Sequence, residues 1–407
     1  MGSRILGAVT RFSDRTARWA TIALGISIPV SVALDNVLLA VIAAGWAAGG
    51  MYREKLAVMR GNPVVLAAIG LYALLLLGAV YGDRNPGDTA NFLGKYVDLA
   101  FIPVFAFLLR DAPTRRLALR AFAAALAVVL ALSYLIKAGL LPTGRLLHGD
   151  PANPVVFKNH ITHNVLMAYG AYLFAIFAAY AVARTERIAW GALALLAAVN
   201  VLFMVHGRTG YVVLAALIFL YFYGRMNWRG LVIAAPLLAA LFAAAYAGSP
   251  GFKQRIDLAL SQASNREHVP AVGDSIGLRL EFARNSLAII GDNPVLGVGT
   301  GGFPKAYAER VRGTSSLPSH NSHNEYLNIA VQIGLVGLAS MLYLLWMQWR
   351  LASRFADPIE THLARGLVLT VAIGSLFTTI LLDHTEGLFF AWLTGLLYAG
   401  LQSPGKQ

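Results

Sequence analysis

The chain has 407 residues, of which 57% are hydrophobic and 13% charged, and its mean hydropathy is +0.62. Apolar runs of about 20 residues recur from end to end, as membrane-spanning helices require, so a soluble globular domain is excluded. The formal net charge is +13, and the absence of cysteine excludes thiol catalysis, thiolate metal sites and disulfides.

The N-terminal segment is basic and polar, and an apolar stretch follows it. Arg4, Arg11, Arg15 and Arg18 alternate with polar residues, and the apolar stretch continues as a span instead of ending at a cleavage site. We therefore expect a retained N-terminus and an all-α polytopic membrane protein with about twelve transmembrane helices. The predicted spans cover residues 17–34, 36–51, 63–81, 96–109, 117–137, 164–183, 188–206, 210–224, 230–247, 326–347, 363–382 and 387–401.

The distribution of basic residues predicts the orientation, because Lys and Arg resist translocation. With both termini inside, the internal connections hold more than half of the 33 basic residues but fewer than a third of the 20 acidic residues. The full charge of +13 then lies on the internal side, and the external connections are neutral. The charge is therefore a topology signal and does not indicate nucleic-acid binding.

In this orientation the unusual polar clusters all fall on the external side. They cover residues 83–95, 147–164, 206–211, 248–325 and 383–386. Any one of them could be an ordinary polar loop. Their convergence on one face nevertheless predicts an active or binding site there.

The longest external connection, residues 248–325, is predicted to fold as a small helical domain between helices one to nine (1–247) and the last three helices (326–407). It contains Leu258–Leu260, a helical stretch at 276–290 and a glycine-rich run at 297–303. The glycine run matches GxGxxG, but no strand or βαβ unit precedes it, so we interpret it as a tight, backbone-exposing turn.

His323 lies where this polar loop enters an apolar helix. The positive end of a helix dipole keeps a nearby imidazole neutral, so that it can accept a proton, and the same end attracts phosphate. These properties make His323 the first candidate for chemistry.

Two arginines are candidates for anion binding. Arg279 occupies the middle of an apolar helical stripe with Phe282 and Ile290, where it must snorkel, pair with an acid or bind an anion. By contrast, Arg284 falls on the polar side near Glu281. Arg208 has glycines on both sides at the external membrane boundary, where it is either an interfacial anchor or a ligand-binding group. The planar fork of Arg suits phosphate.

Two pairs of histidines show the spacing i, i+3, namely His160 with His163 and His320 with His323. Such pairs could assemble a zinc site, but no carboxylate repeats in ligand spacing nearby, and lone histidines are often polar lining. Lys95 and Glu386 could orient a sugar hydroxyl or an imidazole, or be ordinary interface residues.

Several short motifs together resemble a family, and they cover spans seven to ten and the long loop. The motifs are Gly207–Tyr211, Arg279 within a helix, Pro294–Gly299, His323–Leu327 and Gly334–Gly337. In this order and sidedness the chain resembles the superfamily of O-antigen ligases and polymerases, which are polytopic bacterial envelope glycosyltransferases. The segment Lys158–Asn164 is most similar to the ligase branch.

The resemblance implies a glycosyltransferase of lipopolysaccharide biosynthesis in the bacterial inner membrane, with both termini cytoplasmic and a periplasmic active site. It implies transfer of O-antigen polysaccharide from undecaprenyl diphosphate to lipid A-core oligosaccharide, without metal, cofactor or ATP and with inversion at the anomeric carbon. We expect Arg208 and Arg279 to stabilise the leaving diphosphate and His323 to be the general base. Residues expected to bind substrate are Lys95, Lys158, His160, His163, His320, Asn324 and Glu386.

Other functions stay open at this point. An O-antigen polymerase or a protein O-oligosaccharyltransferase would use the same donor with a different acceptor, and His323 could hydrogen-bond the diphosphate or acceptor while another group takes the proton. A lipid-linked saccharide transporter should carry ionisable residues at mid-span depth and internal repeats, which the sequence does not show. A non-catalytic scaffold leaves Arg279 and His323 without a purpose.

Overall fold

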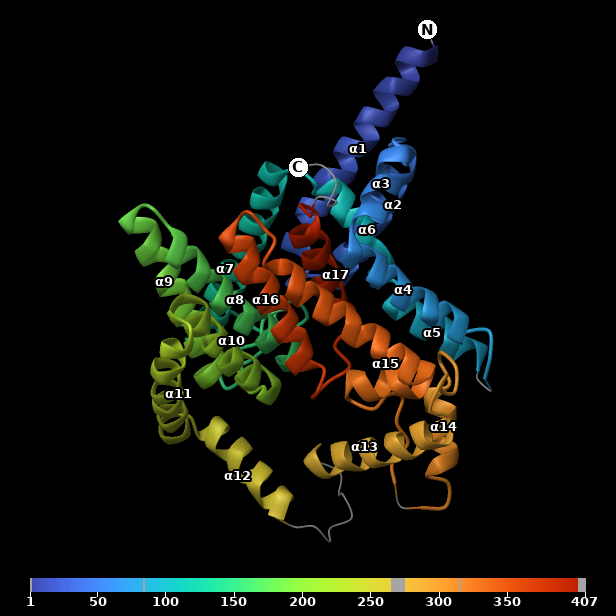
Figure 1. Cartoon of the computed structure of the whole chain (residues 1–407). Helices are drawn as coiled ribbons and strands as arrows, with labels where there is room; N and C mark the ends of the chain where they lie inside the picture. Colours follow the sequence, from blue (N-terminus) through green and yellow to red (C-terminus); the bar gives the residue numbers. More distant parts are fainter. Residues whose placement is uncertain (1, 83–84, 265–274, 315, 402–407) are drawn as a thin grey trace.

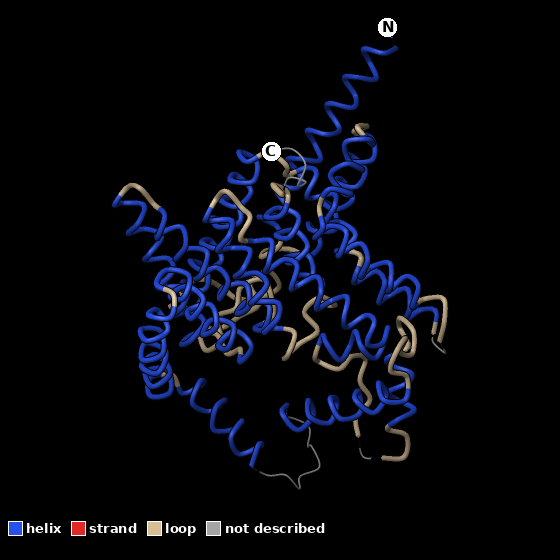
Figure 2. Tube along the Cα trace, viewed as in Figure 1, coloured by secondary structure: helices blue, strands red, loops and turns tan. Residues whose placement is uncertain are grey.

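The computed structural model describes residues 2–82, 85–264, 275–314 and 316–401, and these residues form helices and loops without any β-strand (Figures 1 and 2). The expected all-α polytopic class is confirmed. In chain order the elements are α1 (Gly2–Ser27), α2 (Val32–Ala48), α3 (Tyr52–Gly61), α4 (Pro63–Gly78), α5 (Pro86–Tyr96), α6 (Asp98–Leu108), α7 (Ala112–Lys137), α8 (His160–Tyr180), α9 (Arg184–Val199), the π-helix η1 (Asn200–Met204), α10 (Arg208–Met226), α11 (Trp228–Gly248), α12 (Pro250–Ser264), α13 (Ser275–Asp292), α14 (Phe303–Arg310), α15 (Glu325–Ala352), α16 (Pro358–Gly374) and α17 (His384–Tyr398).

Each of the twelve predicted spans overlaps one of these helices, but their number as full spans is not established. Among the described residues seven helices are long and apolar enough to cross a membrane, or eight if α2 and α3, bent by 113°, form one span. The helices α16 and α17 have 17 and 15 residues, below the roughly 20 that a perpendicular span needs. The predicted span at 96–109 overlaps the second half of a longer candidate span, Pro86–Leu108, whose first half is the more polar helix α5.

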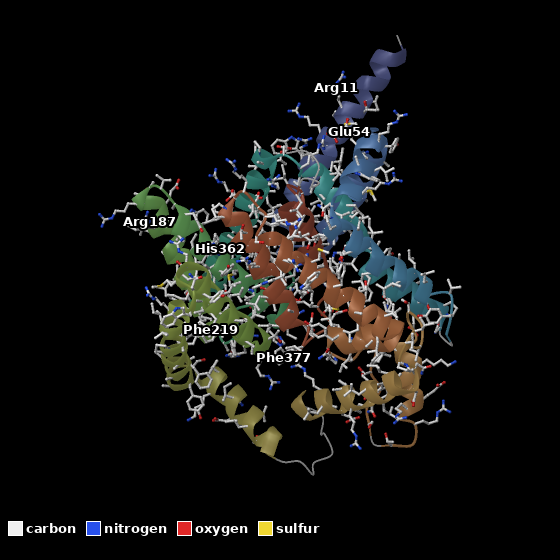
Figure 3. The ribbon with its side chains drawn as sticks, viewed as in Figure 1. Arg11, Glu54, Arg187, Phe219, His362 and Phe377 are labelled. Carbon is white, nitrogen blue, oxygen red and sulfur yellow. The ribbon has the colours of Figure 1, made fainter. Side chains whose placement is uncertain are left out.

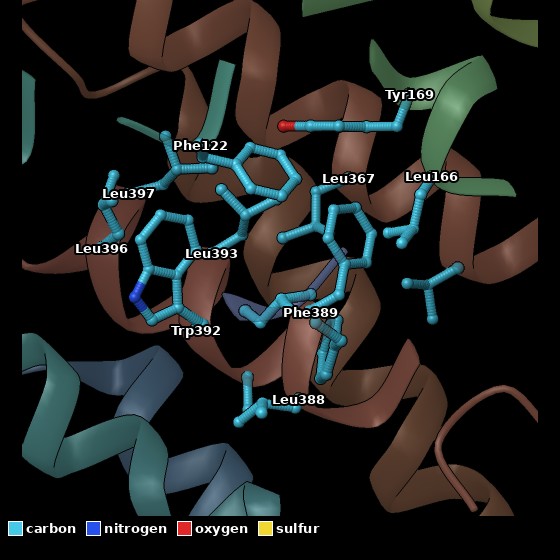
Figure 4. Close-up of a cluster of buried hydrophobic side chains, with 14 of the residues drawn as sticks. Phe122, Leu166, Tyr169, Leu367, Leu388, Phe389, Trp392, Leu393, Leu396 and Leu397 are labelled. Atoms are coloured by element: carbon cyan, nitrogen blue, oxygen red, sulfur yellow. The ribbon is translucent and has the colours of Figure 1, made fainter. Parts of the chain in front are cut away.

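Aromatic packing around α17 forms the centre of the helix bundle (Figure 4). Trp392 and Phe389 on this helix pack against Phe122 of α7 and Tyr169 of α8, with ring centroids 5.6 Å apart for Phe122 and Trp392 and 5.1 Å apart for Tyr169 and Phe389. Trp392 also donates its indole N–H to the carbonyl of Thr21 in α1 at 2.8 Å. Because α17 is enclosed by other helices, it is apolar on all sides.

The helices of the long loop, α12, α13 and α14, lie at the lower end of the molecule in Figure 1, opposite the first turns of α1. The helix expected at 276–290 is present as α13. Phe282, Phe303, Tyr307 and Val331 belong to one small apolar core, which fastens α13 and α14 to α15. We call the segment formed by α12, α13 and α14 the cap.

The glycine-rich run forms the expected tight turn and attaches the cap to the bundle. Gly297, Gly299 and Gly301 all have positive φ angles, and at Gly299 (φ +92°) a Cβ atom would lie 2.3 Å from the carbonyl oxygen of Tyr81. The backbone amide of Gly299 donates to the carbonyl of Gln332 at 2.9 Å. This contact falls beside the kink at Ile333 and Gly334 of α15, where the dihedral angles leave the helical region.

Candidate functional site

A cavity of about 620 Å³ lies between the cap and the bundle helices next to it. Three elements bring the predicted catalytic side chains to it: α10 provides Arg208, α13 provides Arg279, and the turn before α15 provides His323. The complete lining comprises Arg208, Tyr211, Val212, Ala215, Phe242, Phe252, Ile256, Arg279, Leu280, Ala283, Ser322, His323, Asn324, Leu376 and Phe377. Residues far apart in the sequence therefore share one space.

His323 is held at the cavity by its backbone and by one ring contact. Its φ angle is +50°, a left-handed conformation that is uncommon for a residue with a side chain, and its amide donates to Asn321 Oδ1 at 2.9 Å. The imidazole stacks on Phe282 of α13, with centroids 5.4 Å apart and 24° between the ring planes. Asn324 caps α15 by accepting the amide of Leu327 at 3.1 Å. His323 thus lies one residue before Asn324, the N-cap residue of α15, and so near the N-terminus of this helix as expected.

Two effects keep the His323 imidazole neutral. Burial of the group at the cavity wall lowers its pKa below the ordinary histidine value, and the positive charge of Arg279 lowers that pKa further. A neutral imidazole near pH 7 has a free lone pair and can accept a proton. The lowered pKa agrees in direction with the expectation from the sequence, and burial and the charge of Arg279 both contribute to it.

Arg279 is a half-buried cation without an acidic partner among the residues that the structure describes. No carboxylate there lies within ion-pair distance of it, and its pKa is lowered by burial and then by the positive charge of Arg208. Of the three roles open to it from the sequence, pairing with an acid is therefore not seen. Arg208 and Arg279 line the same cavity, and two guanidinium groups in one space are chemically suited to an anionic ligand.

Close packing between α8 and α10 positions Arg208. Asn164 of α8 donates its amide to the carbonyls of Val205 at 3.0 Å and Gly207 at 3.2 Å, just before Arg208 begins α10. A Cβ atom at Gly210 would lie 2.5 Å from Asn164 Cβ. The glycines on either side of Arg208 thus allow a close helix contact, and the guanidinium reaches the cavity at the N-terminus of α10.

Apart from Ser322 and Asn324, the rest of the cavity wall is apolar and aromatic. Tyr211 of α10, Phe242 of α11 and Phe252 of α12 pack together, with centroids 4.8 Å apart for Tyr211 and Phe252 and 5.5 Å apart for Phe242 and Phe252. Leu376 and Phe377 follow α16 and close another side. The cavity therefore has a cationic part and an apolar part, which matches an amphiphilic ligand that carries an anionic group.

Three of the residues expected to bind substrate are buried in contacts between helices and do not line the cavity. Lys158 donates to Thr385 Oγ1 at 3.1 Å, and its Nζ lies 3.9 Å from Asp35 Oδ2. Glu386 Oε1 accepts the hydroxyl of Thr162 at 2.6 Å. His163 is buried, with its Nε2 3.0 Å from Asn200 Oδ1 in the π-helix.

Three others also lie outside the cavity lining: Lys95 and His320 are exposed, and His160 begins α8 beside the Gly207 turn. Asn324 does line the cavity, but its side chain caps α15 and donates to the carbonyl of Leu376 at 3.2 Å. Among the described residues no three His, Cys, Asp or Glu side chains are grouped so as to hold a metal ion, so the histidine pairs do not form the zinc site considered from their spacing.

Phe282, Asn321 and Asn164 are not predicted from the sequence as residues of the site. Phe282 and Asn321 contact His323, and Asn164 holds the turn before Arg208. Phe282 had been placed in the same helical stripe as Arg279, three residues away. The spacing of three residues is the signal for this contact, since both side chains leave the same face of α13, where Arg279 lines the cavity and Phe282 stacks on His323.

Comparisons with known proteins give one family match. Residues 192–342 match the family model described as O-antigen ligase, and this segment contains Arg208, Arg279 and His323. No curated protein matches the chain. A chain in the structure titled "Structural coordination of polymerization and crosslinking by a peptidoglycan synthase complex" is 17% identical, with a TM-score of 0.49 over 84% of this chain and 98% of that chain, a similarity that carries no argument about function. The family match covers less than half of the chain, and it agrees with the resemblance noted from the motifs.

Proposed function

We propose that this O-antigen ligase family member is a glycosyltransferase that moves O-antigen polysaccharide from undecaprenyl diphosphate to lipid A-core oligosaccharide. The reaction takes place at the periplasmic face of the bacterial inner membrane, with both chain termini in the cytoplasm. The observation that carries this proposal is the shared cavity of Arg208, Arg279 and His323.

The composition of the cavity supports a lipid diphosphate as donor. Arg208 and Arg279 supply two planar cations for the diphosphate, and the wall of Tyr211, Phe242 and Phe252 supplies apolar surface for the first part of a polyisoprenoid chain. A soluble nucleotide sugar has no apolar chain to pack against such a wall. The family match independently favours a lipid-linked polysaccharide substrate.

The reaction is a direct displacement. A hydroxyl oxygen of the acceptor sugar attacks the anomeric carbon of the donor, a new C–O bond forms, and the bond from that carbon to the diphosphate oxygen breaks. The electron pair leaves with the diphosphate, whose added negative charge is stabilised by Arg208 and Arg279. His323 takes the proton of the attacking hydroxyl, a role generally worth about 10² to 10⁴ in rate. One displacement inverts the anomeric configuration.

The acceptor has to reach His323 from the external side of the cap. Lys95 and His320 are exposed and available for contacts with a large oligosaccharide, whereas Lys158, His163 and Glu386 hold helices together and act on substrate only through the fold. The diphosphate leaving group carries its own activation, so the proposed reaction requires neither ATP nor a metal.

Purified protein with lipid-linked donor and lipid A-core acceptor tests the proposal. We expect polysaccharide joined to the core in buffer without ATP and with a metal chelator, and transfer at least about 100-fold slower with His323→Gln. Arg284→Gln, on an exposed part of α13, is the matched control and should keep full activity. Product that consists of longer lipid-linked polymer, with an unmodified core, would assign the protein as a polymerase. Glycosylated protein acceptor with unmodified core would assign it as a protein O-oligosaccharyltransferase.

A further inference from the structure

A second cavity, of about 250 Å³, lies at the other end of the helix bundle. Its walls are the first turns of α7 and α16, the last turn of α8 and the start of α9. The lining residues are Arg116, Leu119, Arg120, Phe177, Tyr180, Ala181, Val182, Glu186, Trp190, Asp357, Ile359 and Glu360. None of them takes part in the proposed transfer reaction.

The length of α16 separates the two cavities. Its first residues, Ile359 and Glu360, line the second cavity, whereas Leu376 and Phe377, just beyond its last turn, line the first. A helix of 17 residues is about 25 Å long. Figure 3 shows His362 and Phe377 toward opposite ends of this helix. The second cavity therefore lies about one helix length from the first, at the opposite end of the bundle.

Two arginines on one face of α7 give this cavity a cationic side. Arg116 and Arg120 are one turn apart and exposed, and neither forms an ion pair or hydrogen bond with the residues described. Glu360 in the lining is already paired, because its Oε1 lies 2.8 Å from Arg115 Nε. The guanidinium groups of Arg116 and Arg120 thus face the cavity with open donor positions.

Two acidic residues, Glu186 and Asp357, line another side of this cavity. Glu186 in the first turn of α9 is exposed and has no hydrogen bond or ion pair in the described part of the chain. Asp357 uses Oδ1 to accept the amide of Ile359 at 2.9 Å, which leaves its other oxygen for a donor. After the Arg115–Glu360 pair is set aside, the lining carries two positive and two negative charges. This balance does not suit a purely anionic ligand.

Apolar and aromatic side chains complete the cavity. Phe177 and Trp190 meet edge to face with ring centroids 5.1 Å apart, and Leu119 lies beside them in the lining. Val182, in the connection between α8 and α9, is 96% exposed. An aromatic wall next to exposed aliphatic surface is typical of the boundary between headgroups and acyl chains.

We propose that this cavity binds a zwitterionic phospholipid whose headgroup carries a phosphate diester and a primary ammonium. Arg116 and Arg120 donate to the phosphate oxygens, Glu186 and Asp357 accept from the ammonium, and the acyl chains run along Phe177 and Trp190. Basic pockets between transmembrane helices are known as sites for phospholipid headgroups. The acidic side of this pocket selects the ammonium and disfavours a headgroup with net negative charge.

Lipid binding to the whole purified protein tests the proposal, with native mass spectrometry as the readout. The probes are phosphatidylethanolamine, phosphatidylcholine and phosphatidylglycerol of the same acyl composition, with soluble glycerophosphoethanolamine as competitor. We expect phosphatidylethanolamine to be retained most strongly, because choline cannot donate hydrogen bonds and the glycerol headgroup lacks the cation. Arg116→Gln/Arg120→Gln should weaken that retention about tenfold.

The matched control is Arg350→Gln/Arg354→Gln, which removes two exposed arginines one turn apart near the same end of the bundle but outside the lining. This control should bind as the unchanged protein does. If the first double variant fails to fold, Glu186→Gln provides the second test and should remove the preference for ethanolamine over choline.

Stronger binding of phosphatidylglycerol, equal retention of all three lipids, or equal loss in the control would overturn the proposal. Complete displacement by the soluble headgroup would overturn its lipid part. Transfer activity at the first cavity does not depend on these residues, so failure of this proposal leaves the proposed function intact.

Discussion

Removing the charge of Arg279 should change both the rate and the pH dependence of transfer. Arg279→Gln deletes a cation that we place on the departing diphosphate, and it also removes the positive charge that lowers the pKa of His323. Arg279→Lys keeps the charge but loses the planar fork. The two substitutions therefore separate charge from geometry at one position.

The expected loss follows from the contact that the site offers. Arg279 is half-buried and has no carboxylate partner among the described residues, so its guanidinium is available for charge-assisted hydrogen bonds to phosphate. Such bonds contribute about 2 to 3 kcal/mol, which corresponds to a roughly 30- to 150-fold decrease in kcat/KM for Arg279→Gln. The control Arg284→Gln on the same helix should remain within about twofold of the unchanged protein.

The pH profile gives the second readout. His323 acts as a base only when neutral, so activity is lost as the pH falls through its pKa. Because Arg279 lowers that pKa, the acid limb of kcat/KM for Arg279→Gln should move to higher pH, and the limb for Arg279→Lys should stay near that of the unchanged protein. Initial rates between pH 5 and 9 with purified substrates supply both measurements. Coincident acid limbs in the unchanged protein and Arg279→Gln would refute the electrostatic link.

Three further substitutions test how the site is held. Phe282→Leu removes the ring that stacks on His323 and should lower kcat about two- to tenfold in the fraction of protein that stays folded, and a normal kcat would show that the stack is not needed. Lys158→Met leaves the buried Asp35 without its cation and should cost about 3 to 5 kcal/mol of stability, seen as a lower melting temperature in detergent. Gly299→Ala forces a Cβ against backbone and should detach the cap, so limited proteolysis should cut the loop faster, and unchanged cleavage would contradict this role of the turn.

Much of the fold was predictable from apolar periodicity, since each predicted span overlaps a helix. The start of α5 was not, because Asp88 and Lys95 interrupt the hydropathy of a segment that is nevertheless helical from Pro86. The short helix α17 was found because it is apolar on every side. Hydropathy does not distinguish a helix surrounded by other helices, as α17 is, from a helix surrounded by lipid.

The candidate site was also predictable only in part. Arg279 was identified because a charge in the middle of an apolar stripe has few stable environments. The roles of Lys158 and His163 depend on Asp35 and Asn200, which are distant in the sequence, so a polar residue near a helix start could not be assigned to the cavity or to the core in advance. The stack of Phe282 on His323 likewise joins two elements whose contact only the folded chain reveals.

The central claim is that two arginines hold a lipid diphosphate beside the histidine that takes the proton. Binding of undecaprenyl diphosphate to purified protein, measured with turnover on the same preparations, tests it most directly. The account predicts that Arg208→Gln and Arg279→Gln each weaken binding about tenfold, whereas His323→Gln binds normally and transfers at least about 100-fold more slowly. Normal binding by both arginine variants, or normal turnover by the histidine variant, would contradict it.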